Sequence, residues 1–172
     1  MINIRNGVFE TNSSSSHSIC IKNSENICPL ELHEMIDKNG NLFIPEEDLC
    51  FYRSPFRILT TPFEKLRYAI AQASCYTDAE EYIEQLESLV RSYNPEFSHF
   101  VFELDRYGHP KDPRYGGTDD YILNNWLRTH KVSIENFITN DKYFVVCDGD
   151  EYNIFDGMVR CGLVDKSKIE ID

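Results

Sequence analysis

The chain has 172 residues, of which 41% are hydrophobic and 13% aromatic, so one domain can build a core without disulfide or metal cross-links. Its 29 acidic residues outnumber 17 basic ones, and the formal net charge is −12 at pH 7. Binding to nucleic acid or to anionic lipid depends on Lys and Arg, so this balance argues against direct contact with nucleic acid or a membrane. A basic protein surface suits the charge, although solubility alone also explains it.

The sequence indicates neither a secretion signal nor a membrane span. The N-terminus lacks the apolar run of a signal peptide, and no stretch approaches the roughly 20 apolar residues of a spanning helix. The six cysteines form no Cys-x-x-Cys pair, and no two histidines have the spacing of metal ligands. We therefore expect a cytoplasmic protein with free thiols, no bound metal and no cofactor.

The first 60 residues are predicted to form short strands joined by turns. One or two helical turns are expected at residues 32–36, before the turn signal Asn39-Gly40. The polar run at residues 11–18 favours a loop, because Ser and Asn side chains compete for backbone hydrogen bonds. Strands are expected at residues 19–21, 41–44 and 49–52.

Two helices are predicted at residues 62–75 and 78–92. Thr61 with Glu64, and Thr77 with Glu80, have the spacing of capping boxes. Apolar residues at helical spacing follow each box, which predicts an antiparallel pair with one buried seam. The residues expected to be buried together are Leu66, Ile70, Ile83 and Leu86.

The second half is predicted to alternate between strands and helices. The apolar run at residues 143–147 is the clearest strand and is expected at the centre of a sheet. The other expected elements are a strand at 97–104, a loop at 107–117, helices at 118–127, 133–138 and 151–161, and a strand at 168–171. The resulting fold class is α+β, a single domain over residues 1–172 with one mixed, mostly antiparallel sheet and helices mainly on one face.

An acidic stripe on the second helix is the first candidate site. Residues 78–105 contain eight acidic residues and one basic residue. Glu80, Glu84 and Glu87 share one helical face, where like charges four residues apart cost a few tenths of a kcal/mol. A stripe that folding does not favour suits a basic partner. The competing interpretation is a solvated face whose first-turn acids the helix dipole favours.

A hydroxyl-rich loop is the second candidate site. Hydroxyls and free amides in a loop before a strand suit a phosphate or another anion. The loop has neither the Gly pattern and Lys of a P-loop nor a Gly-x-Ser-x-Gly motif. The competing interpretations are a structural segment that satisfies backbone groups at the end of a sheet and a mobile surface loop. Its candidate ligand-binding residues are Thr11, Asn12, Ser13, Ser14, Ser15, Ser16 and His17.

The loop at residues 107–117 is the third candidate site, because it combines aromatic rings with cations. His109 and Arg114 are its candidate anion-binding residues, and an ordinary surface connection is the alternative. The acidic run at residues 148–151 lacks the spaced oxygen ligands of a calcium loop and is interpreted as a turn with a helix cap.

The order of residues 7–19 carries a resemblance. The run Phe9-Glu10-Thr11-Asn12-Ser13-Ser14-Ser15-Ser16-His17-Ser18 resembles the opening of a group of bacteriophage and prophage proteins of Gram-positive bacteria, which begin Phe-Glu-Thr-Asn-Ser-Ser-Ser-x-His-Ser. The resemblance covers about a dozen residues and implies an origin in a mobile element, with a cytoplasmic location in the bacterial host. It implies no activity.

The leading hypothesis is a phage or prophage accessory protein that acts by binding and is not an enzyme. Its expected target is the basic surface of a host protein, such as a nucleic-acid-handling defence enzyme, which it would inhibit as an anti-CRISPR or similar anti-defence factor. The alternative is a small ligand-binding protein or enzyme that holds a phosphorylated metabolite between the loops at residues 11–18 and 107–117. A virion component is a third interpretation, which only the phage resemblance supports.

Overall fold

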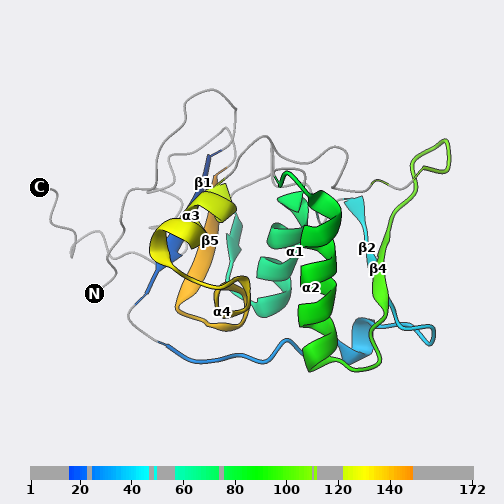
Figure 1. Cartoon of the computed structure of the whole chain (residues 1–172), viewed down its shortest axis with the longest axis horizontal. Coiled ribbons are helices and arrows are strands. Elements are labelled where there is room, and N and C mark those ends of the chain that lie inside the picture. Colours follow the sequence, from blue (N-terminus) through cyan, green and yellow to red (C-terminus); the bar gives the residue numbers. More distant parts are fainter. Residues whose placement is uncertain are drawn as a thin grey trace, which may run out of the picture.

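The computed structural model describes residues 16–22, 25–46, 49, 57–73, 76–109, 111 and 122–148 (Figure 1). The strands in these ranges are β1 (Ser16–Ile21), β2 (Asn41–Ile44), β3 (Arg57–Leu59), β4 (His99–Phe102) and β5 (Tyr143–Asp148). The helices are the 3-10 turn η1 (His33–Met35), α1 (Pro62–Ala71), α2 (Ala79–Tyr93), α3 (Ile122–His130) and α4 (Ile134–Thr139). This content confirms the α+β class.

The described strands form two sheets, so the expectation of a single sheet is wrong. One sheet is antiparallel, with the order β1-β5-β3, which confirms the central place of the apolar strand at residues 143–147. The other is a parallel pair of β2 and β4. In Figure 1, α1 and α2 stand between the two sheets. Each sheet therefore has a face toward these helices. The sequence pattern of a single strand does not reveal this arrangement of two sheets.

The helix α1 begins with the capping box expected from the sequence. The Glu64 amide donates to Thr61 Oγ1 over 3.3 Å, and the Thr61 amide donates to Glu64 Oε2 over 2.9 Å. Pro62 occupies the first turn, where its missing N–H costs nothing. Such caps are worth about 1 kcal/mol each, so this start is fixed locally.

The helix α2 begins one residue later than expected. Asp78, not Thr77, is its cap, because the Asp78 carboxylate accepts the Glu81 amide over 3.0 Å. Asp is at least as good a cap as Thr, and its charge also suits the helix N-terminus. At the other end, the buried Asn94 side chain binds Leu32 N and Leu30 O, each over 2.8 Å. The segment before η1 is thereby fixed to the end of α2.

The predicted seam between α1 and α2 is confirmed. Leu66, Ile70 and Leu86 have no exposed surface and Ile83 keeps 5%, and all four belong to one apolar cluster with residues from both sheets. The two helices therefore connect the two halves of the core.

Other predictions meet the structure only in part. The strand β3 was not expected, and α3 continues to His130, three residues past the last residue named for the predicted helix. The strand predicted at residues 49–52 lies mostly outside the described residues, and the elements predicted at 151–161 and 168–171 lie wholly outside them.

Candidate functional site

The acidic residues of α2 divide into two groups by their contacts. Glu80 and Glu84 are exposed, and their carboxylates form no hydrogen bond or ion pair with the described part of the chain. Their neighbour Glu81 accepts only a long hydrogen bond, of 3.4 Å, from Gln85. Two carboxylates one helical turn apart are thus left to water, as the sequence predicted for this face.

Glu87 has a different role from the other two members of the predicted stripe. Its Oε1 atom accepts the Phe100 backbone amide over 2.9 Å, and its side chain is half-buried. One turn later Arg91 donates to the carbonyls of Ser98, over 2.8 Å, and Phe97. Glu87 and Arg91 therefore attach α2 to the start of β4. The expectation that all three carboxylates stand in open water is wrong for Glu87.

The chain after β4 forms a tight hairpin, described over residues 103–109 and at 111, which overlaps the predicted loop at 107–117. The carboxylate of Asp105 organises it, accepting the amides of Tyr107 over 2.8 Å and His109 over 2.9 Å. These hydrogen bonds lower the pKa of Asp105, the one from His109 most. Gly108 closes the turn with φ of 81°.

An ion-pair network fixes the base of the hairpin. The Lys111 ammonium contacts the carboxylates of Glu46 and Glu103, and Glu103 also accepts the Glu46 amide over 3.0 Å. The hydrogen bond from the Glu46 backbone amide, and after it the contact with Lys111, hold the pKa of Glu103 below its usual range. Hydrogen bonding to Glu46 raises the pKa of Lys111. The hairpin is held at both its turn and its base.

The tip of the hairpin presents side chains to solvent. Tyr107 is 69% exposed and Leu104 57%. The Arg106 guanidinium lies over the Tyr107 ring, 4.7 Å from its centroid, and His109 is exposed beside them. Aromatic and Arg side chains favour binding when their positions are already fixed, because binding then has little conformational-entropy cost.

The described parts of the two predicted anion-binding loops do not meet. Ser16 and His17 belong to β1, paired in register with Asp148 and Cys147 of β5. Figure 1 places β1 and the hairpin that carries His109 at opposite sides of the molecule. Thr11, Asn12, Ser13, Ser14, Ser15 and Arg114 lie outside the described residues, as does most of the acidic run at 148–151. The phosphorylated ligand stays a prediction.

A buried lysine is the polar feature that sequence reasoning missed. Lys65 has no exposed surface, and its Nζ atom donates to Asn140 O over 2.7 Å and Tyr143 O over 3.1 Å. Burial lowers the pKa of Lys65 from 10.5 to about 8. The sequence offered one signal for this burial. Lys65 has helical spacing with Ala69 and Gln72, both of which are buried.

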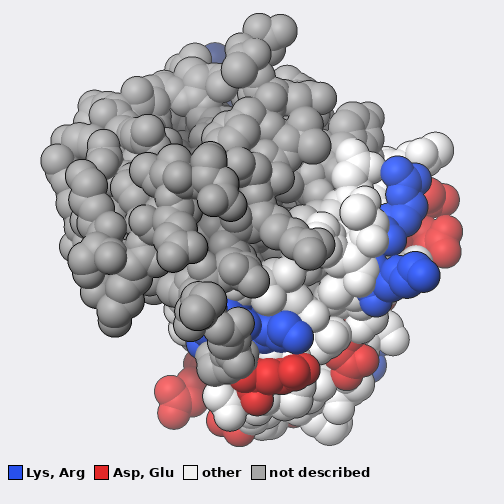
Figure 2. Space-filling model, turned by 90° about the vertical axis from the view of Figure 1, so that its left-hand side faces the viewer, with Lys and Arg blue, Asp and Glu red and all other residues white. Residues whose placement is uncertain are grey.

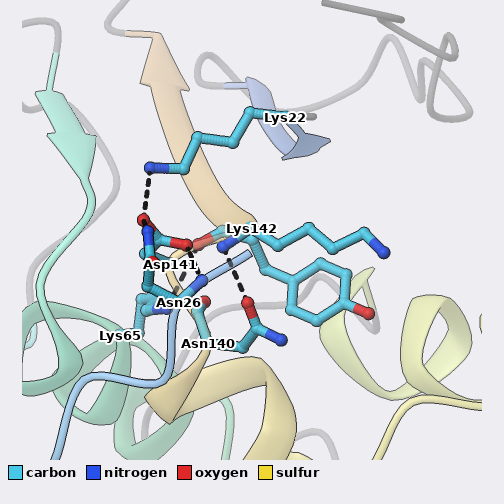
Figure 3. Close-up of polar contacts among 7 residues, drawn as sticks. Lys22, Asn26, Lys65, Asn140, Asp141 and Lys142 are labelled. Carbon is cyan, nitrogen blue, oxygen red and sulfur yellow. Dashed lines mark hydrogen bonds and ion pairs between the residues drawn. The ribbon is translucent and has the colours of Figure 1, made fainter. Parts of the chain in front are cut away.

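Lys65 belongs to a group of residues that joins three segments (Figure 3). Asp141 accepts from Lys22 Nζ over 3.0 Å and from the Asn26 amide over 2.7 Å. The side-chain and backbone hydrogen bonds from Asn26, followed by the one from Lys22, lower the pKa of Asp141 to about 2. The chain after β1, the turn before β5 and α1 are thus linked. Because Lys65 is inaccessible and bonded to carbonyls, this group is structural rather than catalytic.

No three His, Cys, Asp or Glu side chains of the described residues gather as a metal site. Cys28 and Cys147 are free, and burial raises the pKa of Cys20 to about 11 and of Cys147 to about 12, which suppresses the thiolates of these two residues. Cys50, Cys75 and Cys161 lie outside the described residues.

No protein-family model matches the chain, and no curated protein or solved structure matches it. Functional argument therefore rests on its own geometry and charge. Among the described helices, none has both the length and the apolar character required to cross a membrane. On the face shown in Figure 2, basic and acidic side chains lie beside one another, so the described surface there has no single sign of charge.

Proposed function

We propose that the protein acts by binding a basic surface of another protein, which the exposed carboxylates of α2 contact. The observation that carries the proposal is that Glu80 and Glu84 stand in solvent with no cation of the described chain beside them. The dipole of α2 favours an acid in its first turn and so accounts for Glu80. Glu84 lies beyond that turn, and its repulsion with Glu80 remains uncompensated in the free protein.

The net charge of −12 supports the same proposal, because it speeds the approach of a basic partner. The resemblance of residues 9–18 to phage and prophage proteins supplies the setting. In that setting, the protein is an accessory factor that inhibits a host protein, such as a nucleic-acid-handling defence enzyme. The basic channel of such an enzyme is the kind of surface that a carboxylate pair fits.

Capture from a lysate of a Gram-positive bacterium tests the proposal. The tagged full chain is compared with the double variant Glu80→Gln, Glu84→Gln, which keeps both side-chain lengths. The control is Glu25→Gln, Glu135→Gln, which removes the same charge from exposed residues elsewhere and also alters their contacts with Lys142 and Tyr93. We expect a basic protein to bind the wild type and the control but not the α2 variant. The association of this basic protein with the wild-type chain should slow as the salt concentration increases.

Stability is measured alongside binding. The α2 variant should unfold within about 0.5 kcal/mol of the wild type, because neither carboxylate supports a described contact. Equal capture of one partner by all three proteins, or capture of no basic protein, would refute the proposal.

A further inference from the structure

The parallel pair of β2 and β4 has one face that the described part of the chain leaves largely uncovered. Leu42, Ile44 and Phe100 are at most 6% exposed and face the core. On the opposite face Phe43 is 54% exposed, and its register partner Val101 is half-buried. We call the face with Phe43 and Val101 the outer face.

An uncovered outer face is unusual for this kind of sheet. Parallel strands occur almost only where both faces are covered, whereas antiparallel sheets tolerate water on one side. Phe43 in the middle of β2, and Leu104 and Tyr107 in the hairpin that continues β4, are large apolar side chains with more than half of their surface exposed. Larger exposed apolar patches commonly mark an interaction site. The outer face therefore has the properties of a surface that is covered in a complex.

Two turns border the outer face. Figure 1 shows the hairpin at residues 103–111 and the turn after η1 projecting beyond β2 and β4, on the side away from α1 and α2. The hairpin contributes the exposed Leu104 and Tyr107 and is held by the contacts of Asp105 and Lys111. A partner would meet a preformed surface, with little ordering cost.

The charge around the outer face selects the partner. Residues 31–46 and 96–111 contain the strands and both turns, and they carry seven acidic against three basic residues, of which Lys111 is already paired with Glu46 and Glu103. Apolar centres with charged rims are typical of protein interfaces, and complementary rims give specificity. A basic rim around an apolar side chain is the complement of this surface.

From these observations we infer that the outer face of β2 and β4, with the hairpin tip, is the docking site for a protein segment in which an apolar side chain is flanked by Lys or Arg. Phe43 is the central contact and Tyr107 a peripheral one. The inference rests on the proposed function only in assuming a basic protein partner. It assigns the contact to a surface different from the carboxylates of α2.

Amide NMR titration of the isotope-labelled full chain tests the inference. The probe is a synthetic peptide of alternating Leu and Lys, and the controls are peptides of alternating Leu and Glu and of alternating Ser and Lys. We expect the Leu–Lys peptide to shift the amides of β2, β4 and residues 103–109, with weaker binding as salt increases. The two control peptides should leave these amides unchanged.

The variants assign the contact to single residues. Phe43→Ser should weaken binding about tenfold or more, the usual loss for a central interface residue. Ile27→Ser is the matched control, because Ile27 is 63% exposed but lies elsewhere, and it should bind as the wild type does. Tyr107→Ser, at a tip far from the core, should weaken binding without lowering the melting temperature. It keeps the test valid if Phe43→Ser fails to fold.

The outcomes separate this inference from the proposed function. Shifts confined to α2, abolished by Glu80→Gln with Glu84→Gln, would overturn the inference and leave the proposed function standing. Shifts of the β2 and β4 amides that persist unchanged in the Glu80→Gln, Glu84→Gln variant would support the inference. They would also refute the assignment of the contact to the carboxylates of α2. Sedimentation that shows a dimer dissociated by Phe43→Ser would also overturn the inference, because the outer face would then be covered by a second copy.

Discussion

Replacing Lys65 by Met should change how the stability of the protein depends on pH. The Lys65 ammonium is fully buried, and burial lowers its pKa from 10.5 to about 8. Between those two values the unfolded chain binds more protons than the folded one, so the free energy of unfolding must rise with pH. Below pH 8 both states are protonated, and the full penalty of about 3 kcal/mol opposes folding.

The magnitude can be worked out for two accessible pH values. Raising the pH from 7 to 9 deprotonates most of the folded Lys65 amine but little of the unfolded one. The wild type should therefore gain about 1.4 kcal/mol over Lys65→Met between these pH values. Other groups that titrate in this interval are present in both proteins, and their contributions cancel in the difference.

Urea unfolding at pH 7 and pH 9 measures this difference. The only tryptophan is a suitable probe, because Trp126 stacks on His130 and contacts the Tyr143 ring, which belongs to the strand that Lys65 binds. Lys142→Met is the control, because it removes the same charge from a partly exposed position next to the same strand.

Equal pH dependence in the wild type and Lys65→Met would refute the reasoning, since the ammonium would then not be desolvated. The stability of Lys65→Met at a single pH is not diagnostic. Its loss of two charged hydrogen bonds and its relief from the burial penalty have opposite signs and similar sizes.

Four further predictions concern the core and the thiols. Leu86→Ala should cost roughly 2–5 kcal/mol in urea unfolding, because the side chain has no exposed surface and its removal leaves a cavity. Gly40→Ala should cost about 2 kcal/mol or more, because Gly40 has φ of 83° and a new Cβ would lie 2.5 Å from Ser98 Oγ. Asn94→Ala should lower the melting temperature and speed amide exchange at Leu32, whose amide would lose its buried acceptor; unchanged exchange would contradict that hydrogen bond. Thiol titration of the denatured, unreduced chain should find all six cysteines, and fewer would reveal a disulfide.

Features that depend on neighbouring residues were predictable from the sequence. The capping box of Thr61 and Glu64 acts within one helical turn, and it appeared at the expected residues. The strand at residues 143–147 was recognisable because a continuous apolar run of that length requires burial on both faces. Asp78 shows the limit of this approach, because two adjacent good caps compete and their difference is small.

Features that depend on distant residues were not predictable. The strand β3 has only three residues, and its extended form follows from pairing with β5. Lys65 can be buried because carbonyls more than 70 residues away accept hydrogen bonds from its ammonium. The parallel pairing of β2 with β4 likewise depends on how α1 and α2 return the chain, so the exposure of Phe43 became visible only in three dimensions.

Glu87 combines a feature that the sequence predicts with one that depends on distant residues. The spacing of Glu80, Glu84 and Glu87 assigns all three to one helical face, but α2 lies close enough to β4 for Glu87 to accept the Phe100 amide. With Arg91 bound to the Ser98 carbonyl, α2 occupies backbone groups that an edge strand would otherwise offer to another chain. A partner is thereby denied part of the edge of β4, while the outer face around Phe43 stays open. The same helix that presents two carboxylates to solvent thus also restricts how the neighbouring sheet can be approached.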